Sequence, residues 1–210
     1  PSSRTEGGVG VTIAVFASGS GTNFERLVQV SREERWLVPI VVLICDQPGA
    51  HVLKRADRLG VPSYVFSPKA FETKAAYEQA VYDVLRRHDV TWIVLAGYMR
   101  LVGPTLLDAY PNRIVNIHPS LLPAFPGKNA VGQALAHGVK VTGVTVHFVD
   151  EGMDTGSIIA QRAVDVSETD DEHSLTAKIQ AVEHELYPHI VRQLTEEETT
   201  KSDIVERAVT

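Results

Sequence analysis

The sequence has one cysteine, no long apolar run and fewer basic than acidic residues. A lone Cys45 excludes a disulfide within these residues and a zinc site built on several cysteines. No apolar stretch approaches the length of a membrane span, and the start, PSSRTEGGVG, is too polar for a signal peptide. The net charge of −6 argues against a surface that grips nucleic-acid phosphates. We therefore expect a cytoplasmic protein that binds neither membranes nor nucleic acid.

What the chain does contain is an alternation of strand-like and helix-like segments. Short apolar runs predict strands at 11–17, 39–46, 62–66, 91–97 and 113–118, followed by a pair at 141–150 and 157–164. Helical spacing of apolar residues lies between them, at 50–59, 71–88 and 131–137, and predicts a long last helix over 175–194. This order is typical of an α/β fold, a doubly wound, mostly parallel sheet with helices on both faces.

The chain divides into three parts on this evidence. Residues 1–10 have no periodicity and are predicted to be a flexible arm, and 11–195 form a single domain. Residues 196–210 are predicted to be an acidic, frayed tail.

A glycine-rich turn, SGSGTN, follows the first predicted strand and precedes a helix. It comprises Ser18, Gly19, Ser20, Gly21, Thr22 and Asn23. The glycines allow close backbone approach, and exposed N–H groups at a helix start can bind an anion. The third glycine of a dinucleotide-binding fingerprint is missing, because Phe24 stands in its place. A single phosphate is therefore a better candidate ligand than NAD, and a plain tight turn is the alternative.

The strand RIVNIH carries Asn116 and His118 two residues apart, on one face, just before Pro119. Carbonyl chemistry needs a donor for a developing oxyanion and a group that moves protons near neutral pH. Asn and His suit these two tasks. A solvent-facing strand edge, or a histidine bonded to a loop carbonyl, would give the same pattern.

Acidic residues follow the next long strand, in the turn DEGMDTG. Asp150, Glu151 and Asp154 can be merely solvated, or one carboxylate can face His118, favour its charged form and orient the ring. His147, on that strand, is either a partner behind the site or a buried structural histidine.

Two features of the last helix have plain explanations. Gln180 and Glu183 share a face that a solvated helix surface would explain. The segment EHELYPH resembles a zinc-binding helix, but its histidines are five apart with Pro188 between them, so no metal is expected.

Taken in order, these segments resemble the folate-dependent formyltransferase family. The resemblance is carried by SGSGTNF, LAGYMRLVGP, IVNIHPSLLPAFPG, GVTVHFVDEGMDTGSII and QAVEHELYP, and covers roughly residues 11–194. The glycine loop and the last helix narrow it to the branch that acts on phosphoribosylglycinamide (glycinamide ribonucleotide). It implies formyl transfer from 10-formyltetrahydrofolate, the co-substrate, to the amine of that ribonucleotide in de novo purine (IMP) biosynthesis. It also implies small-molecule substrates, no metal, and a monomer or homodimer.

The resemblance also implies roles for individual residues. Asn116, His118 and Asp154 match the catalytic trio, 18–23 the phosphate loop, and Gln180 with Glu183 the glycinamide end of the substrate. Positions matching the folate site are Lys74, Met99, Arg100, Leu101, Val102, Asn116, Val149, Asp150, Glu151 and Asp154.

A few positions depart from the family pattern. Lys74 stands where an arginine is familiar, which keeps the charge but loses the bidentate fork. Asn129 stands where histidine is common, so a proton role there is in doubt. Ser20 and Thr22 also differ, which a phosphate site built on backbone groups should tolerate.

Four other functions are rivals. A formyltetrahydrofolate hydrolase would use the same trio but is expected to carry an extra amino-terminal domain. A formyltransferase acting on methionyl-tRNA is expected to carry an extra carboxyl-terminal one. The incomplete glycine fingerprint disfavours an NAD-dependent oxidoreductase, and the intact trio disfavours an inactive binding module.

Overall fold

The computed structural model describes residues 10–209, with side chains as far as residue 201. The predicted flexible arm at 1–10 therefore lies almost entirely outside the described residues. The elements occur in the order β1 (Ile13–Ala17), α1 (Thr22–Glu33), β2 (Ile40–Cys45), α2 (His51–Leu59), β3 (Ser63–Val65), a 3-10 turn (Pro68–Ala70), α3 (Lys74–Arg87), β4 (Trp92–Leu95), α4 (Pro104–Ala109), β5 (Ile114–His118), α5 (Ala130–His137), β6 (Val141–Phe148), β7 (Ile158–Asp165) and α6 (Glu172–Val209). None of the described helices is both long enough and apolar enough to cross a membrane.

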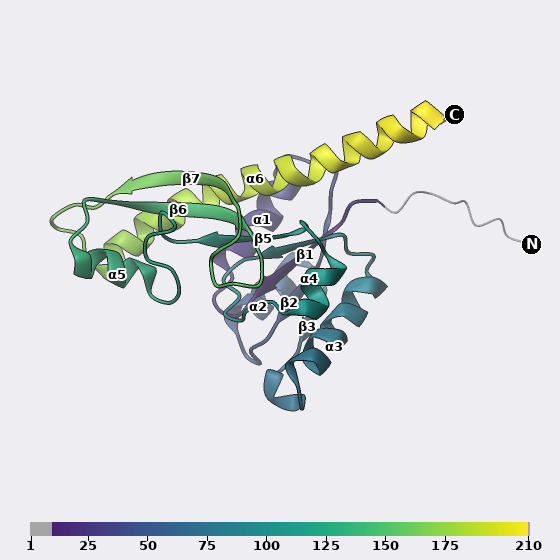
Figure 1. Cartoon of the computed structure of the whole chain (residues 1–210), viewed down its shortest axis with the longest axis horizontal. Coiled ribbons are helices and arrows are strands. Elements are labelled where there is room, and N and C mark those ends of the chain that lie inside the picture. The colour runs from purple at the N-terminus through teal and green to yellow at the C-terminus, as the bar shows by residue number, and fades with distance from the viewer. Residues whose placement is uncertain (1–9, 210) are drawn as a thin grey trace, which may run out of the picture.

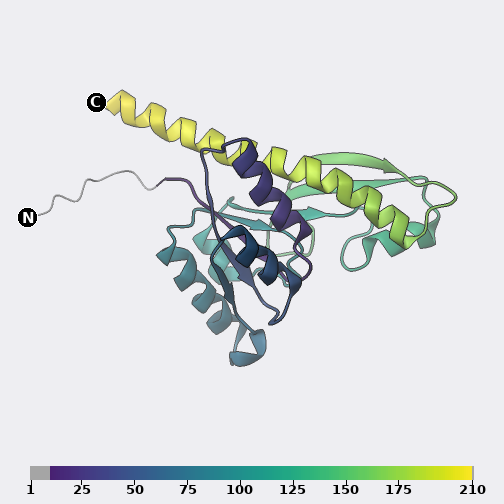
Figure 2. The same ribbon diagram turned by 180° about the vertical axis from the view of Figure 1, so that it is seen from behind.

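One seven-stranded sheet organises these elements, in the strand order β3-β2-β1-β4-β5-β6-β7. Strands β1 to β5 pair in parallel, whereas β6 runs antiparallel to β5, and β7 antiparallel to β6. Helices α3 and α4 lie on one face of the sheet (Figure 1), and α1, α2 and α6 cover the other, as the reverse view shows (Figure 2). The predicted α/β fold with a mostly parallel sheet is confirmed.

The two faces of β1 explain why its sequence is apolar throughout. Ile13, Val15 and Ala17 point into the core beneath α1, α2 and α6. Ala14 and Phe16 point into the second core, beneath α3 and α4. A strand covered on both faces has no polar side to show, so it reads as a continuous apolar run.

The order in which strands are added to the sheet reverses between β1 and β4. From β1 the strands proceed outward to β2 and β3, and the chain then crosses back to place β4 on the other side of β1. Such a reversal leaves a crevice at the carboxyl ends of the strands, where ligands bind in open α/β sheets. The segments after β1, β4 and β5 all meet at this edge.

The prediction that the last helix ends near Leu194 in a frayed tail is wrong, because α6 continues to Val209 (Figure 1). The apolar stripe does stop there, but the acidic residues that follow contact the body of the protein. Glu196 accepts the N–H of Leu37 at 3.2 Å, and Glu198 accepts the indole N–H of Trp92 at 2.6 Å. These long-range contacts replace apolar packing and were not visible in the periodicity.

Candidate active site

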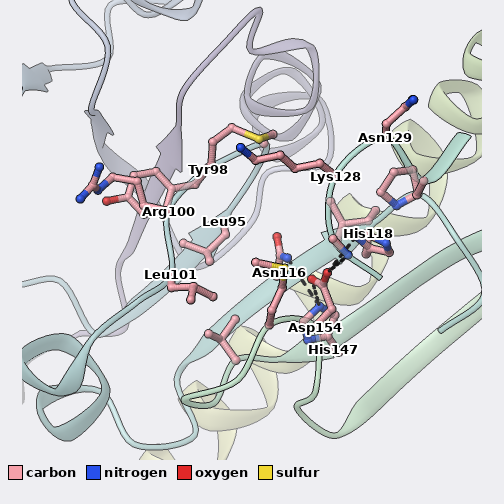
Figure 3. Close-up of a pocket in the computed structure, with 18 of the residues that line it drawn as sticks. Leu95, Tyr98, Arg100, Leu101, Asn116, His118, Lys128, Asn129, His147 and Asp154 are labelled. Carbon is pink, nitrogen blue, oxygen red and sulfur yellow. Dashed lines mark hydrogen bonds and ion pairs between the residues drawn. The ribbon is translucent and has the colours of Figure 1, made fainter. Parts of the chain in front are cut away.

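A cavity of about 590 Å³ lies at the carboxyl edge of the sheet. Strand ends, the segment after β4, the loops around 127–131 and 149–154, and one side of α6 surround it (Figure 3). The candidate residues that line it are Asn23, Met99, Arg100, Leu101, Val102, Asn116, His118, His147, Val149, Asp150, Asp154 and Glu183. Most of the residues selected from the sequence are therefore brought together in one cavity.

Asn116 and His147 are direct neighbours across the pairing of β5 with β6. Side chains at opposed positions of an antiparallel pair lie on the same face of the sheet. The amide Nδ2 of Asn116 lies 3.5 Å from His147 Nε2, at the long limit of a hydrogen bond. His147 is thereby a neighbour of the candidate oxyanion donor and not an isolated core residue.

Burial and a backbone hydrogen bond favour one neutral form of the His147 ring. Its side chain is almost fully buried, and this burial lowers its pKa, although hydrogen bonding to the Phe148 carbonyl and the nearby Asp154 carboxylate raise it in part. Nδ1 lies 2.8 Å from the Phe148 carbonyl oxygen, so in the neutral ring Nδ1 carries the proton. Nε2 is then an acceptor for one amide N–H of Asn116, which leaves the other N–H available to a ligand.

His118 faces oxygen atoms on both sides of its ring. Nδ1 lies 3.5 Å from Asp154 Oδ2, as Figure 3 shows. Nε2 lies 2.8 Å from the carbonyl oxygen of Phe125. Only the doubly protonated ring can donate toward both acceptors. The expectation that a carboxylate of the acidic turn faces His118 agrees with this arrangement, and Asp154 is the one that does.

Asp154 connects two loops around the two histidines. Its Oδ2 accepts the N–H of Gly127 at 2.9 Å, and its Oδ1 lies 3.7 Å from His147 Nε2. Asp154 has φ 55°, a left-handed conformation that aspartate tolerates better than most residues. The carboxylate is mostly buried and holds the β6–β7 loop against the loop that follows β5.

The other two acids of the turn have different surroundings. Asp150 Oδ1 accepts the hydroxyl of Thr155 at 2.7 Å and the N–H of Gly152 at 3.0 Å. The Thr155 hydrogen bond is the main cause that lowers the Asp150 pKa, against a weaker opposing effect of burial. Asp150 thus shapes the turn, whereas Glu151 is exposed and does not line the cavity.

The glycine loop is held at the start of α1 by contacts from both neighbouring elements. Gly21 has φ 78° and is the residue before the helix, and a Cβ there would lie 2.3 Å from Val52 Cγ2. Val52 donates its N–H to the Gly19 carbonyl at 3.0 Å. Ser18 is hydrogen-bonded to the segment after β4. Its N–H donates to the Gly97 carbonyl at 3.0 Å, and its Oγ accepts the N–H of Met99 at 2.9 Å.

Glu183 and Asn23 form a buried polar pair at one end of the cavity. The Asn23 amide donates to Glu183 Oε2 at 2.6 Å. Burial raises the pKa of the Glu183 carboxyl, and this hydrogen bond lowers it in part. Asn23 Oδ1 is also buried and has no partner among the described residues. An amine could pair with both groups. Because Glu183 is buried and lines the cavity, it does not belong to a solvated helix face. Gln180 is half-buried and does not line the cavity.

The segment Met99–Val102 forms another wall of the cavity. Met99 is 69% and Leu101 47% exposed, which large apolar side chains seldom are unless they contact a ligand or partner. The Arg100 guanidinium stacks over the Tyr77 ring at 5.1 Å. Lys74 lies outside the cavity lining, at the start of α3 beside this segment.

Several lining residues were not among the candidates selected from the sequence. They are Tyr98, Lys128, Met153, Glu172 and Thr176, among others, and most lie in loops or on a helix whose position depends on tertiary contacts.

The structure shows what Asn129 does at the position where a proton role was in doubt. It caps α5, with its Oδ1 accepting the N–H of Gly132 at 3.2 Å, so it serves as a helix cap.

Comparisons with known proteins agree with this geometry. The family model described as formyl transferase matches residues 11–191. A phosphoribosylglycinamide formyltransferase of Bacillus subtilis is 55% identical over 181 residues, which is 86% of this chain and 93% of that protein. The crystal structure of a phosphoribosylglycinamide formyltransferase from Bacillus halodurans is 54% identical, with a TM-score of 0.85, and covers 87% of this chain and 94% of that one. That of glycinamide ribonucleotide transformylase 1 from Geobacillus kaustophilus is 55% identical, with a TM-score of 0.85, and covers 88% and 98%.

Proposed function

This chain belongs to the formyl transferase family, and we propose on that premise that it formylates phosphoribosylglycinamide. The formyl donor is 10-formyltetrahydrofolate, and the step belongs to de novo purine (IMP) biosynthesis. The relatives that align with this chain over almost all of their own length are named for this activity. The observation that carries the proposal is the meeting of Asn116, His118 and Asp154 in one cavity.

The reaction proceeds by direct attack. The amine nitrogen of the ribonucleotide bonds to the formyl carbon, and the carbonyl electron pair moves to oxygen, giving a tetrahedral intermediate. When this intermediate collapses, the bond to the folate nitrogen breaks and the formyl group stays on the acceptor. The proton lost by the attacking amine is delivered to the departing folate nitrogen. Because both substrates are held side by side, the step depends on positioning and electrostatics and forms no covalent bond with the protein.

The oxyanion is stabilised by two donors. Asn116 offers the amide N–H that His147 leaves free, and His118 offers a ring N–H in its charged form. His118 Nε2 lies 2.8 Å from the Phe125 carbonyl oxygen, so the ring exchanges this partner for the formyl oxygen when substrates bind. Catalytic hydrogen bonds are often rearranged in this way between free and bound enzymes.

Asp154 supports proton transfer. Its carboxylate, 3.5 Å from His118, balances the charge of the imidazolium, and through a water molecule it relays the proton from the amine to the folate nitrogen. His147 is not a reacting group in this scheme, because its contact with Asn116 only orients the amide.

The two substrates meet in the cavity. The phosphate binds the loop of residues 18–23, of which only Asn23 lines the cavity, through backbone N–H groups at the start of α1. The glycinamide end lies near Gln180 and against Glu183, whose carboxylate holds the amine before reaction. The folate takes Met99–Val102 and the loop 149–154, with Lys74 near its glutamate tail. We further infer a cytoplasmic enzyme without a metal requirement, acting as a monomer or homodimer.

The test is a set of cavity variants assayed by steady-state kinetics. We expect Asn116→Ala and His118→Ala each to lower kcat by about 10²–10³, with a much smaller change in equilibrium folate binding. His189→Ala is the control, because that histidine is exposed on α6 and does not line the cavity. An unchanged kcat in either cavity variant would refute the assignment of the site.

A further inference from the structure

The segment Met99–Gly103, which includes the cavity wall Met99–Val102, has neither helical nor strand structure. Irregular backbone near a core needs partners for its N–H groups, and it has few rigid neighbours to define its shape. The affinity of this wall for a ligand would therefore depend on the contacts that hold the segment in place.

Two side chains from outside the segment bind its two ends. At the first end, Met99 donates its N–H to Ser18 Oγ at 2.9 Å. At the other end, Gly103 donates its N–H to Glu78 Oε2 at 2.7 Å. Glu78 is only 3% exposed, and a carboxylate is seldom buried to this degree without a specific partner. Among the described residues, this N–H is the only hydrogen-bond partner recorded for the Glu78 side chain.

The approach of α3 to this end of the segment is unusually close. A Cβ added to Gly103 would lie 2.6 Å from Glu78 Oε1 and 3.1 Å from Lys74 Cε. The absence of a side chain therefore lets both α3 residues lie against the backbone. Glu78 follows Lys74 by one helical turn, so α3 presents both side chains to the same place.

We propose that Glu78 is a positioning residue for the co-substrate, holding the segment Met99–Gly103 in the shape that binds formyl-folate. The inference rests on the proposed function, since it assumes that this wall binds the folate. Glu78 does not line the cavity and touches no reacting atom. Its effect is exerted through the Gly103 N–H, which fixes the end of the segment opposite Ser18.

The kinetic test compares Glu78→Ala, Glu78→Gln and Val84→Ala. A hydrogen bond to a carboxylate typically favours the paired state about tenfold or more. We expect Glu78→Ala to raise the KM for 10-formyltetrahydrofolate by about tenfold, with the ribonucleotide KM changed less than about twofold. Glu78→Gln keeps an acceptor oxygen and should restore most of the affinity. Val84 is buried on the same helix, so Val84→Ala weakens α3 without removing the contact and should leave both KM values near those of the unaltered protein.

The proposal is overturned if Glu78→Ala leaves the formyl-folate KM unchanged, or if Val84→Ala raises it equally. A second measurement does not depend on turnover. Amide hydrogen exchange of the ligand-free protein should be at least about tenfold faster at Gly103 in Glu78→Ala, with β4 amides unaffected. Unchanged exchange at Gly103 would contradict the tether itself. Absence of formyl transfer by the unaltered protein would instead contradict the proposed function.

Discussion

The glycine loop offers a sharp quantitative test at Gly21. Replacing it by alanine adds a Cβ that would lie 2.3 Å from Val52 Cγ2, 2.6 Å from Val52 Cβ and 2.9 Å from Val52 Cα. The last of these is a backbone atom, so α2 must move and a rotamer change cannot suffice. The residue also has φ 78°, which costs an alanine about 1–2 kcal/mol. Overpacking of this kind adds about 1–3 kcal/mol.

The expected total is about 2–5 kcal/mol of lost unfolding free energy. For a chain of this size each kcal/mol lowers Tm by about 2–4 °C, so the melting temperature should fall by roughly 4–20 °C. Gly19→Ala is the matched control, because nothing lies within 4 Å of its Cβ position. We expect that control to change stability by less than about 0.5 kcal/mol. Both proteins can be compared by urea denaturation and thermal melting.

A double variant identifies the cause. Val52→Ala removes the nearest clashing methyl but keeps Cβ and Cα, so it should offset part of the Gly21→Ala cost and not all of it. Equal melting temperatures for Gly21→Ala and Gly19→Ala would refute the reasoning. So would strict additivity of Gly21→Ala with Val52→Ala, since the two side chains would then not interact.

Two further predictions concern buried polar groups. Burial raises the pKa of Glu183 in the folded protein. The contribution of this carboxyl to stability is therefore greatest below its pKa in the unfolded chain and is lost as pH rises through its folded pKa. Glu183→Gln should raise Tm at pH 8 but not at pH 4, and it should raise the ribonucleotide KM. Equal Tm differences at both pH values would contradict this. Thr145 Oγ1 accepts the N–H of Leu122 at 3.0 Å and the amide N–H of Gln161 at 3.1 Å, and it donates to Ser120 O at 2.7 Å. Thr145→Val removes all three hydrogen bonds and should cost about 2–4 kcal/mol in urea denaturation. An unchanged midpoint would show that these groups find other partners.

The sequence was most informative where one residue pattern has one physical explanation. Apolar runs predicted the central strands β1, β2 and β4, because parallel strands covered on both faces must be apolar. The spacing of Asn116 and His118 predicted a shared face of β5, and the structure places both side chains at the cavity. The catalytic roles of these residues stay predictions until they are tested.

The features that were missed depend on tertiary contacts. Helix α4 has only six residues, too few to show a period. Lys128 lines the cavity through the path of a loop, which no local pattern encodes. Glu78 lies in a predicted helix where no local pattern sets it apart from the other polar residues, and only the approach of Gly103 explains its burial. The continuation of α6 likewise depends on residues distant in the sequence, such as Trp92.

Formyl transfer, measured with and without glycinamide ribonucleotide, is the decisive assay for the proposed reaction. Absorbance reports the appearance of the folate product from 10-formyltetrahydrofolate. We predict product formation that requires the ribonucleotide and is lost in His118→Ala. Product formed equally fast without the ribonucleotide would make water the acceptor, contradict the proposed transfer, and leave the glycine loop of residues 18–23 without its proposed phosphate.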